Sequence, residues 1–73
     1  MASTRIQAVR LRHEMALRGL HASDLARKAG LSEATLCAAL QGRRVSVRTL
    51  TKIAVALSRV PAVAVAEALL ETA

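Results

Sequence analysis

The stretch that decides the fold is GLHASDLARKAGLSEATLCAALQ, which runs from Gly19 to Gln41. A short helical pattern at residues 23–29 runs into Gly30, and a second short helical pattern opens after two further residues. Two helices joined so tightly cannot lie antiparallel, because a turn of about three or four residues that contains a glycine sets them at a steep angle. This is the geometry of a helix-turn-helix, which leaves the second helix clear of the body of the domain.

Length and composition favour one small helical domain. The chain has 73 residues, no aromatic residue, three glycines and one proline. A core made only of Leu, Ile, Val, Met and Ala packs well when helices lie close together, and the glycines and the proline fall at junctions between helical patterns. We therefore expect a single all-α domain over residues 1–73, built from about four or five helices.

Cysteine usage and hydropathy indicate the compartment. Cys37 is the single cysteine and has no partner for an internal disulfide, which fits a reducing cytosol. No stretch approaches the roughly 20 apolar residues of a membrane span. Arg5, Arg10 and Arg12 interrupt the amino end, where a secretory signal would be apolar. The expectation is a soluble, cytoplasmic protein.

The charge is strongly positive and unevenly spread. The formal net charge is +6, and two of the five acidic residues, Glu67 and Glu71, lie near the carboxyl end. The rest of the chain is correspondingly more basic, which favours a polyanionic partner, with nucleic acid first. The alternative is an ordinary solvated surface, which charge alone does not exclude. The helix-turn-helix pattern supports the first interpretation.

Capping residues and helix stops place five helices. Ser32 and Ser46 each precede a helical pattern, and a serine hydroxyl accepts a hydrogen bond from the free backbone amides of the next turn. Gly19 is a good stop for the first helix, and Pro61 suits the first turn of the last one. The expected helices cover residues 5–18, 23–29, 33–41, 47–58 and 61–72, with residues 1–4 frayed and a basic loop at Arg43 and Arg44.

Apolar spacing predicts the buried side of each helix. The first helix is apolar on two opposite sides, so one side is expected to face the helix-turn-helix and the other the carboxyl-terminal segment. The first side comprises Ala8, Leu11 and Met15, and the second comprises Ile6, Val9, Ala16 and Leu17. In the later helices the residues predicted to be buried are Leu25, Ala26 and Ala29; Leu36, Ala39 and Leu40; Val47, Leu50, Ile53, Ala54 and Leu57; and Val63, Val65, Ala66, Leu69 and Leu70.

A longer set of residues stands in register with the turn over about residues 11–57. Its members are Gly19-Leu20, Leu25-Ala26, Ala29-Gly30-Leu31-Ser32, Thr35-Leu36, Gly42, Ser46-Val47, Thr49-Leu50, Lys52-Ile53-Ala54 and Ala56-Leu57. The set resembles the Cro and lambda-repressor-like helix-turn-helix family. A chance helical bundle could reproduce the apolar spacing, but hardly the turn together with the capped fourth helix.

The resemblance implies a function. Members of this family are dimeric, sequence-specific binders of double-stranded DNA and are usually transcriptional repressors. Chains this short look like phage Cro proteins or small prophage regulators, which act in a bacterial or phage-infected cell. Family dimers place two recognition helices about 34 Å apart on a near-palindromic operator.

Two departures from the family pattern stand out. Many members carry a buried ion pair between an Arg late in the first helix and a Glu at the end of the third, and Met15 and Leu40 occupy those positions here. Replacing both partners by apolar side chains is roughly neutral, whereas losing one would strand a charge. The second helix opens with His21 and Ala22, so the usual Gln contact to phosphate is missing. Ser23 or the free amides of that helix end can take its place.

By resemblance, base pairs are read from the outer edge of the third helix. Glu33 can accept a hydrogen bond from cytosine N4, whereas Ala34 and Ala38 can only contact a thymine methyl group. Cys37 is interpreted as a small filler against a base edge rather than a redox switch. With no Arg or Gln on this edge, discrimination is expected to be modest or to depend on DNA shape. Alternatively, the alanines are simply good helix formers on an exposed face.

Affinity is expected from contacts with the DNA backbone. Arg48 lies in the first turn of a helix, where positive charge is unfavourable, so we assign it another role. Arg5, Arg10, Arg12 and Arg59 are interpreted as solvated surface. The residues assigned to the backbone are Arg43, Arg44 and Arg48, then Arg27 and Lys28, with Ser23, Ser32, Thr35 and Gln41 beside them.

The carboxyl-terminal apolar residues are expected to form a two-fold dimer contact. Such a surplus of apolar surface marks an interface. The alternative is a small antitoxin or protein-interaction module that grips a different partner through the same helix. The assigned residues are Val60, Val63, Val65, Ala66, Leu69 and Leu70.

Other chemistries find no support. His13 and His21 have no third ligand at helical spacing, so no metal site is expected. No nucleophile, base and acid set appears, and acidic residues are too few for a paired-carboxylate mechanism. We expect neither an enzyme nor a cofactor nor a small-molecule ligand.

Overall fold

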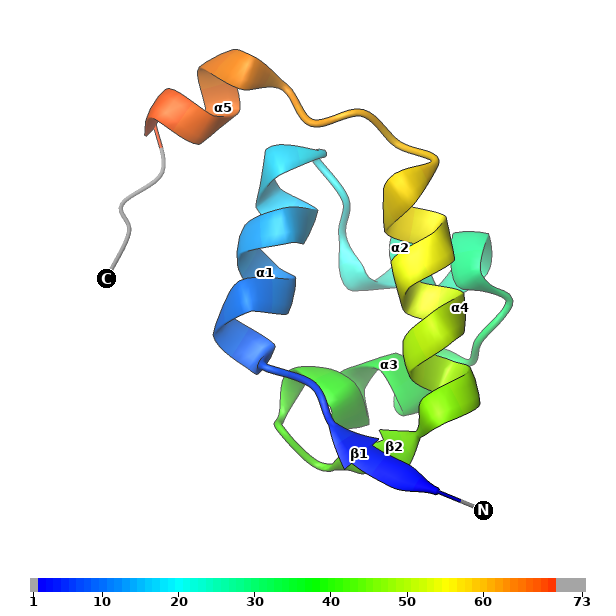
Figure 1. Cartoon of the computed structure of the whole chain (residues 1–73). Helices are drawn as coiled ribbons and strands as arrows, with labels where there is room; N and C mark the ends of the chain where they lie inside the picture. Colours follow the sequence, from blue (N-terminus) through cyan, green and yellow to red (C-terminus); the bar gives the residue numbers. More distant parts are fainter. Residues whose placement is uncertain (1, 70–73) are drawn as a thin grey trace.

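The computed structural model describes residues 2–69, which form five helices and one short antiparallel ribbon (Figure 1). The ribbon was not predicted and is the one addition to the expected all-helical class. In chain order the elements are β1 (Ser3–Arg5), α1 (Ala8–Leu17), α2 (Ala22–Ala29), α3 (Glu33–Leu40), β2 (Arg44–Ser46), α4 (Val47–Ser58) and α5 (Ala64–Leu69).

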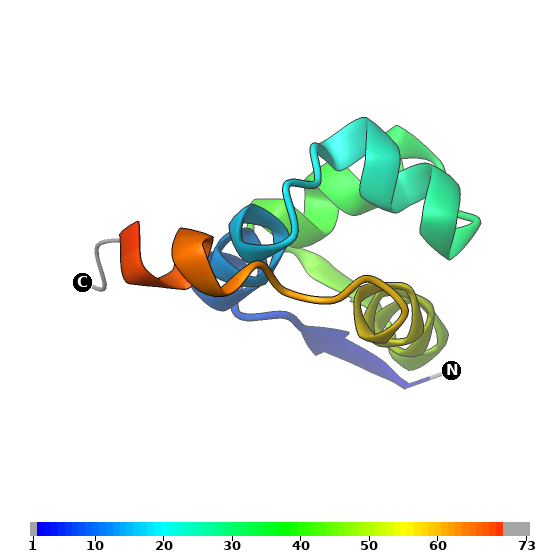
Figure 2. The same ribbon diagram turned by 90° about the horizontal axis from the view of Figure 1, so that it is seen from above.

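The core lies between the first four helices. Leu25 of α2, Leu36 of α3 and Ile53 of α4 are its largest fully buried side chains. Leu11 and Met15 close the core from α1. Viewed from above, α2 and α3 lie together on one side of the domain, α4 lies opposite them, and α5 extends beyond α1 (Figure 2). Short aliphatic side chains thus fill the interior, as the absence of aromatic residues requires.

Local sequence signals set three helix ends in the way predicted. The Oγ of Ser32 accepts a hydrogen bond from the Thr35 backbone N–H at 3.1 Å, and Ser46 does the same for Thr49 at 3.0 Å. Gly30 ends α2 in the left-handed conformation, with φ of 68°, which favours glycine because it has no Cβ. Both predicted caps and the glycine turn are therefore confirmed.

The prediction that residues 1–4 are frayed is wrong for Ser3 and Thr4. Within that stretch, Ser3 and Thr4 pair with Ser46 and Val45 in the ribbon, and Arg5 pairs with Arg44. Arg44 therefore belongs to a strand rather than to a loop, and the first helix begins at Ala8, not at residue 5. The strands are three residues long, too short for an alternating pattern to reveal them.

Two further corrections concern α4. Its buried side is formed by Ile53 and Ala56, because α4 packs against α2 on that side. Val47 is 44% exposed and Leu50 is 36% exposed, so the predicted apolar stripe is buried only in part. Ala54 is also exposed, and it lines an apolar groove with Leu50 that faces α1.

The carboxyl-terminal segment also differs from the prediction. α5 begins at Ala64, so Pro61 precedes the helix instead of opening it. The segment does pack against the second side of α1, because the Val63 N–H donates to the Leu17 carbonyl at 2.8 Å and Leu17 is buried. Val9, predicted for the same side of α1, is 76% exposed and remains outside this contact.

Candidate nucleic-acid interface

α3 has one buried edge and one exposed edge. Leu36 and Ala39 are fully buried against the core. Glu33, Ala34 and Cys37 are exposed on the opposite edge, and Ala38 is half-buried beside them. The edge predicted to read base pairs is therefore accessible along the helix. The exposed groups on this edge are one carboxylate, one free thiol and small methyl groups.

The cap of α3 uses two of the side chains assigned to the DNA backbone. The hydroxyl groups of Ser32 and Thr35 lie 2.8 Å apart in a hydrogen bond. Ser32 also accepts from the Thr35 backbone N–H, so both hydroxyls already serve the helix start. Gln41, the residue assigned at the other end of α3, is exposed and follows the last helical residue.

The first turn of α2 carries a carboxylate that the sequence reading overlooked. The His21 backbone N–H donates to Oδ2 of Asp24 at 3.0 Å, which makes Asp24 part of the helix cap. This hydrogen bond, with the nearby Arg27 guanidinium, lowers the pKa of Asp24. Arg27 Nη2 lies 3.1 Å from Asp24 Oδ1, so the positive charge of Arg27 is partly compensated. Ser23 and Lys28 are exposed close by.

The arginines after α3 lack such compensation. Arg43, Arg44 and Arg48 are all exposed, and none lies within ion-pair distance of the carboxylates of Glu14, Asp24 or Glu33. The three ion pairs among the described side chains use Glu14 and Asp24, which lie on α1 and α2. Positive charge is therefore concentrated where the chain leaves α3 and enters α4. A polyanion would meet no local competition there.

This geometry can be compared with known families. A family model described as a Cro/C1-type HTH DNA-binding domain matches residues 10–62. The chain belongs to this family. No curated protein and no solved structure matches the chain.

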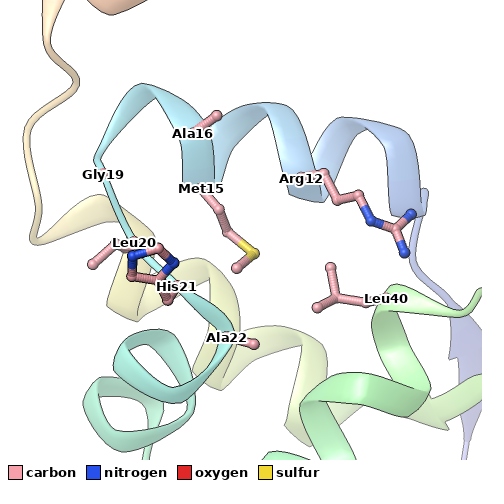
Figure 3. Close-up of a pocket in the computed structure, with 8 residues that line it drawn as sticks. All are labelled: Arg12, Met15, Ala16, Gly19, Leu20, His21, Ala22 and Leu40. Atoms are coloured by element: carbon pink, nitrogen blue, oxygen red, sulfur yellow. The ribbon is translucent and has the colours of Figure 1, made fainter.

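In this Cro/C1-type domain an open hollow lies at the two positions where the resemblance implies a buried ion pair. Met15 of α1 and Leu40 of α3 line it together, and Figure 3 shows both side chains beside the same space. The hollow measures about 450 Å³, and Arg12 and His21 lie at its rim. The pair of substitutions therefore leaves an apolar surface rather than a stranded charge.

The predicted dimer residues of the Cro/C1-type domain are mostly accessible. Val63, Val65 and Leu69 are 54%, 68% and 79% exposed, which corrects the expectation that they are buried in the single chain. Val60 and Ala66 are half-buried. Leu70 lies outside the described residues.

No helix within residues 2–69 is long and apolar enough to cross a membrane. In that part of the chain, no three His, Cys, Asp or Glu side chains converge on a common point where a metal ion would fit.

Proposed function

We propose that this protein is a sequence-specific transcription regulator, a Cro-like repressor that binds a near-palindromic operator as a dimer in the cytoplasm of a bacterial or phage-infected cell. The observation that carries the proposal is that α3 is buried along one edge and exposed along the other. Leu36 and Ala39 anchor one edge in the core, and Glu33, Ala34 and Cys37 are free on the other. A helix held in this way can enter the major groove without disturbing the fold.

Affinity in this proposal comes mainly from charge. Among the described side chains, no carboxylate pairs with Arg43, Arg44 or Arg48. These three arginines lie between the end of α3 and the first turn of α4. Each phosphate neutralised by such a side chain releases counterions, so binding weakens as salt rises. Glu33 supplies base preference, and Ala34 and Ala38 make apolar contact with a thymine methyl group.

Dimerisation is proposed because one helix-turn-helix covers too few base pairs for useful specificity. The exposed Val63, Val65 and Leu69 supply apolar surface for a two-fold contact. The same exposure favours a second candidate, a protein-interaction module of the antitoxin type that uses this surface for a different protein. The unpaired arginines beside α3 support the first candidate over the second.

An electrophoretic shift assay tests the proposal. The wild-type chain is titrated against the DNA upstream of its own gene and against a scrambled duplex of equal length and composition, at one salt concentration. We expect retardation of the upstream duplex at a concentration at least about tenfold lower, because specific sites bind far more tightly than random ones. Equal affinity for both duplexes would contradict sequence-specific regulation. Failure to retard either duplex would favour the interaction module.

A further inference from the structure

The outer face of the β1–β2 ribbon carries two arginines in register. Arg5 of β1 is the direct partner of Arg44 of β2. The adjacent pair of the ribbon, Thr4 and Val45, faces the other way, and Val45 is buried in the core. Because strand side chains alternate between faces, Arg5 and Arg44 share the solvent side of the ribbon, where both are exposed.

This arrangement is unfavourable in the free protein. Side chains directly opposite in an antiparallel pair have Cβ atoms about 4.5–5.5 Å apart, and like charges at that position destabilise the sheet. Among the described carboxylates, those of Glu14, Asp24 and Glu33, none lies within ion-pair distance of either arginine. The Arg44 Nη1 reaches only the Ser3 carbonyl and hydroxyl oxygens, both at 3.5 Å, which are neutral and diagonal to it. The repulsion between the two guanidinium groups therefore remains uncompensated.

The ribbon lies next to the proposed DNA-binding elements. β2 follows α3 after a short loop and packs against it, and α4 begins directly after β2. β1 is joined to the start of α4 as well, since the Val47 N–H donates to the Ala2 carbonyl at 3.4 Å. Figure 1 shows the two strands beside α3 and at the foot of α4. Arg5 is thus brought to the same end of the domain as Arg44 and Arg48.

We propose that the outer face of this ribbon is a second contact with the DNA backbone, in which Arg5 and Arg44 share one phosphate group. A phosphate presents several acceptor oxygens to two guanidinium forks and cancels the repulsion between them. The inference rests on the proposed function and extends it, because it adds a strand from the amino end to an interface otherwise formed by residues 21–48. DNA binding then tightens the pairing of β1 with β2.

The proposal requires opposite effects on the free and the bound protein. Removing one of the two charges relieves repulsion in the free protein, so its melting temperature should stay equal or rise. The same change removes one phosphate contact, so DNA binding should weaken. A residue with a merely structural role would lower the melting temperature together with the affinity.

The test uses Arg5→Gln, Arg44→Gln and Arg5→Lys in the full chain, with Arg59→Gln as the matched control. Arg59 is equally exposed but lies at the other end of α4. Fluorescence anisotropy with a mixed-sequence duplex of about 20 base pairs is recorded between about 50 and 200 mM salt, and the melting temperature of each free protein is measured. Because one arginine still holds the shared phosphate when the other is replaced, we expect the salt slope to fall by less than about one unit for each glutamine variant and to stay unchanged for Arg59→Gln and Arg5→Lys.

Three results would overturn the proposal. The first is an unchanged slope for Arg5→Gln when Arg43→Gln lowers it, which leaves the proposed DNA-binding function intact. The second is a lower melting temperature for free Arg5→Gln than for the wild type, since the pair would then be stabilising. The third is the absence of salt-dependent binding by the wild type itself, which removes the proposed function and this inference together.

Discussion

The side chain of Arg18 donates a hydrogen bond from its Nε to the backbone carbonyl of Val60, at 2.8 Å across 42 residues of sequence. The same nitrogen also donates to the Leu57 carbonyl at 2.9 Å, and Nη1 donates to the carbonyl and the carboxylate of Glu14. The last carbonyls of a helix lack their usual partners within it, so Arg18 adds a donor at the end of α4, where the Leu57 carbonyl also accepts from the Val60 N–H at 3.2 Å. The side chain of Arg18, the residue that follows α1, thus holds the point from which the chain departs toward α5.

Replacing Arg18 by Met should therefore lower the free energy of unfolding by more than the same change at an exposed arginine. The Arg18 side chain is only 15% exposed, and the change removes the donor to the Val60 carbonyl and to Oε1 of Glu14. We expect a loss of about 2 kcal/mol in the free energy of unfolding, measured by urea denaturation. Arg10→Met is the matched control, because Arg10 pairs with the same Glu14 but is 71% exposed, and it should cost less than about 1 kcal/mol. Equal losses for the two variants would refute the role given to Arg18.

The stability of the domain should fall in acid through Glu14. The hydrogen bond from Arg18, more than any other contact, lowers the pKa of Glu14 below its ordinary value of 4.5. A carboxyl whose pKa is lowered by folding adds stability above its unfolded pKa, and that stability is lost as the pH drops through the folded pKa. Urea unfolding at a series of pH values should show a decline below 4.5 that is smaller in Glu14→Gln than in the wild type. An identical decline in both proteins would place the acid sensitivity elsewhere.

Ser32 allows the helix cap to be separated from DNA binding. Ser32→Ala removes the acceptor for the Thr35 N–H and should cost about 1 kcal/mol in unfolding free energy. Ser32→Asp keeps an acceptor at the cap and should preserve stability. In the proposed complex it also places a negative charge beside the DNA backbone, so its affinity for a duplex should fall while its melting temperature does not. Retention of full affinity by Ser32→Asp would show that this helix start lies away from the phosphates.

Glu33 should determine base preference at one operator position. A carboxylate accepts from cytosine N4, whereas a glutamine amide pairs with adenine. Selection of binding sites from random duplexes should therefore show a shift of about 1–3 kcal/mol in preference at a single position for Glu33→Gln, with the rest of the site unchanged. Identical selected sites for wild type and Glu33→Gln would exclude a direct reading role.

Val65 and Leu69 should control the state of association. They are 68% and 79% exposed in the single chain, and a charge at either position would be buried in a two-fold contact through α5. Sedimentation equilibrium should show a dimer for the wild type and a monomer for Val65→Asp. Thr51→Asp, an exposed position on α4, should leave the dimer intact. A monomeric wild type both free and on DNA would remove the dimer from the proposed function.

Sequence reasoning succeeded where the determining contacts are local. The Gly30 turn and the caps at Ser32 and Ser46 each depend on a few adjacent residues, so their chemistry can be read directly from the chain. The exposure of Glu33 and Cys37 followed in the same way, because the periodicity of α3 assigns Leu36 to the core and leaves the other edge outside.

Only the tertiary structure decided the features that join distant parts of the chain. The pairing of Arg5 with Arg44, the partners of Arg18, and the exposure of Val65 and Leu69 have no local signature. The physical reason is that a three-residue strand has too short a pattern to identify itself, and a long polar side chain is satisfied by whatever acceptors the fold brings near it. The sequence by itself determined the helix-turn-helix and its exposed edge, because those depend on neighbours along the chain. The packing of α1 against α5, and of β1 against β2, determined where the apolar surface and the free charges lie.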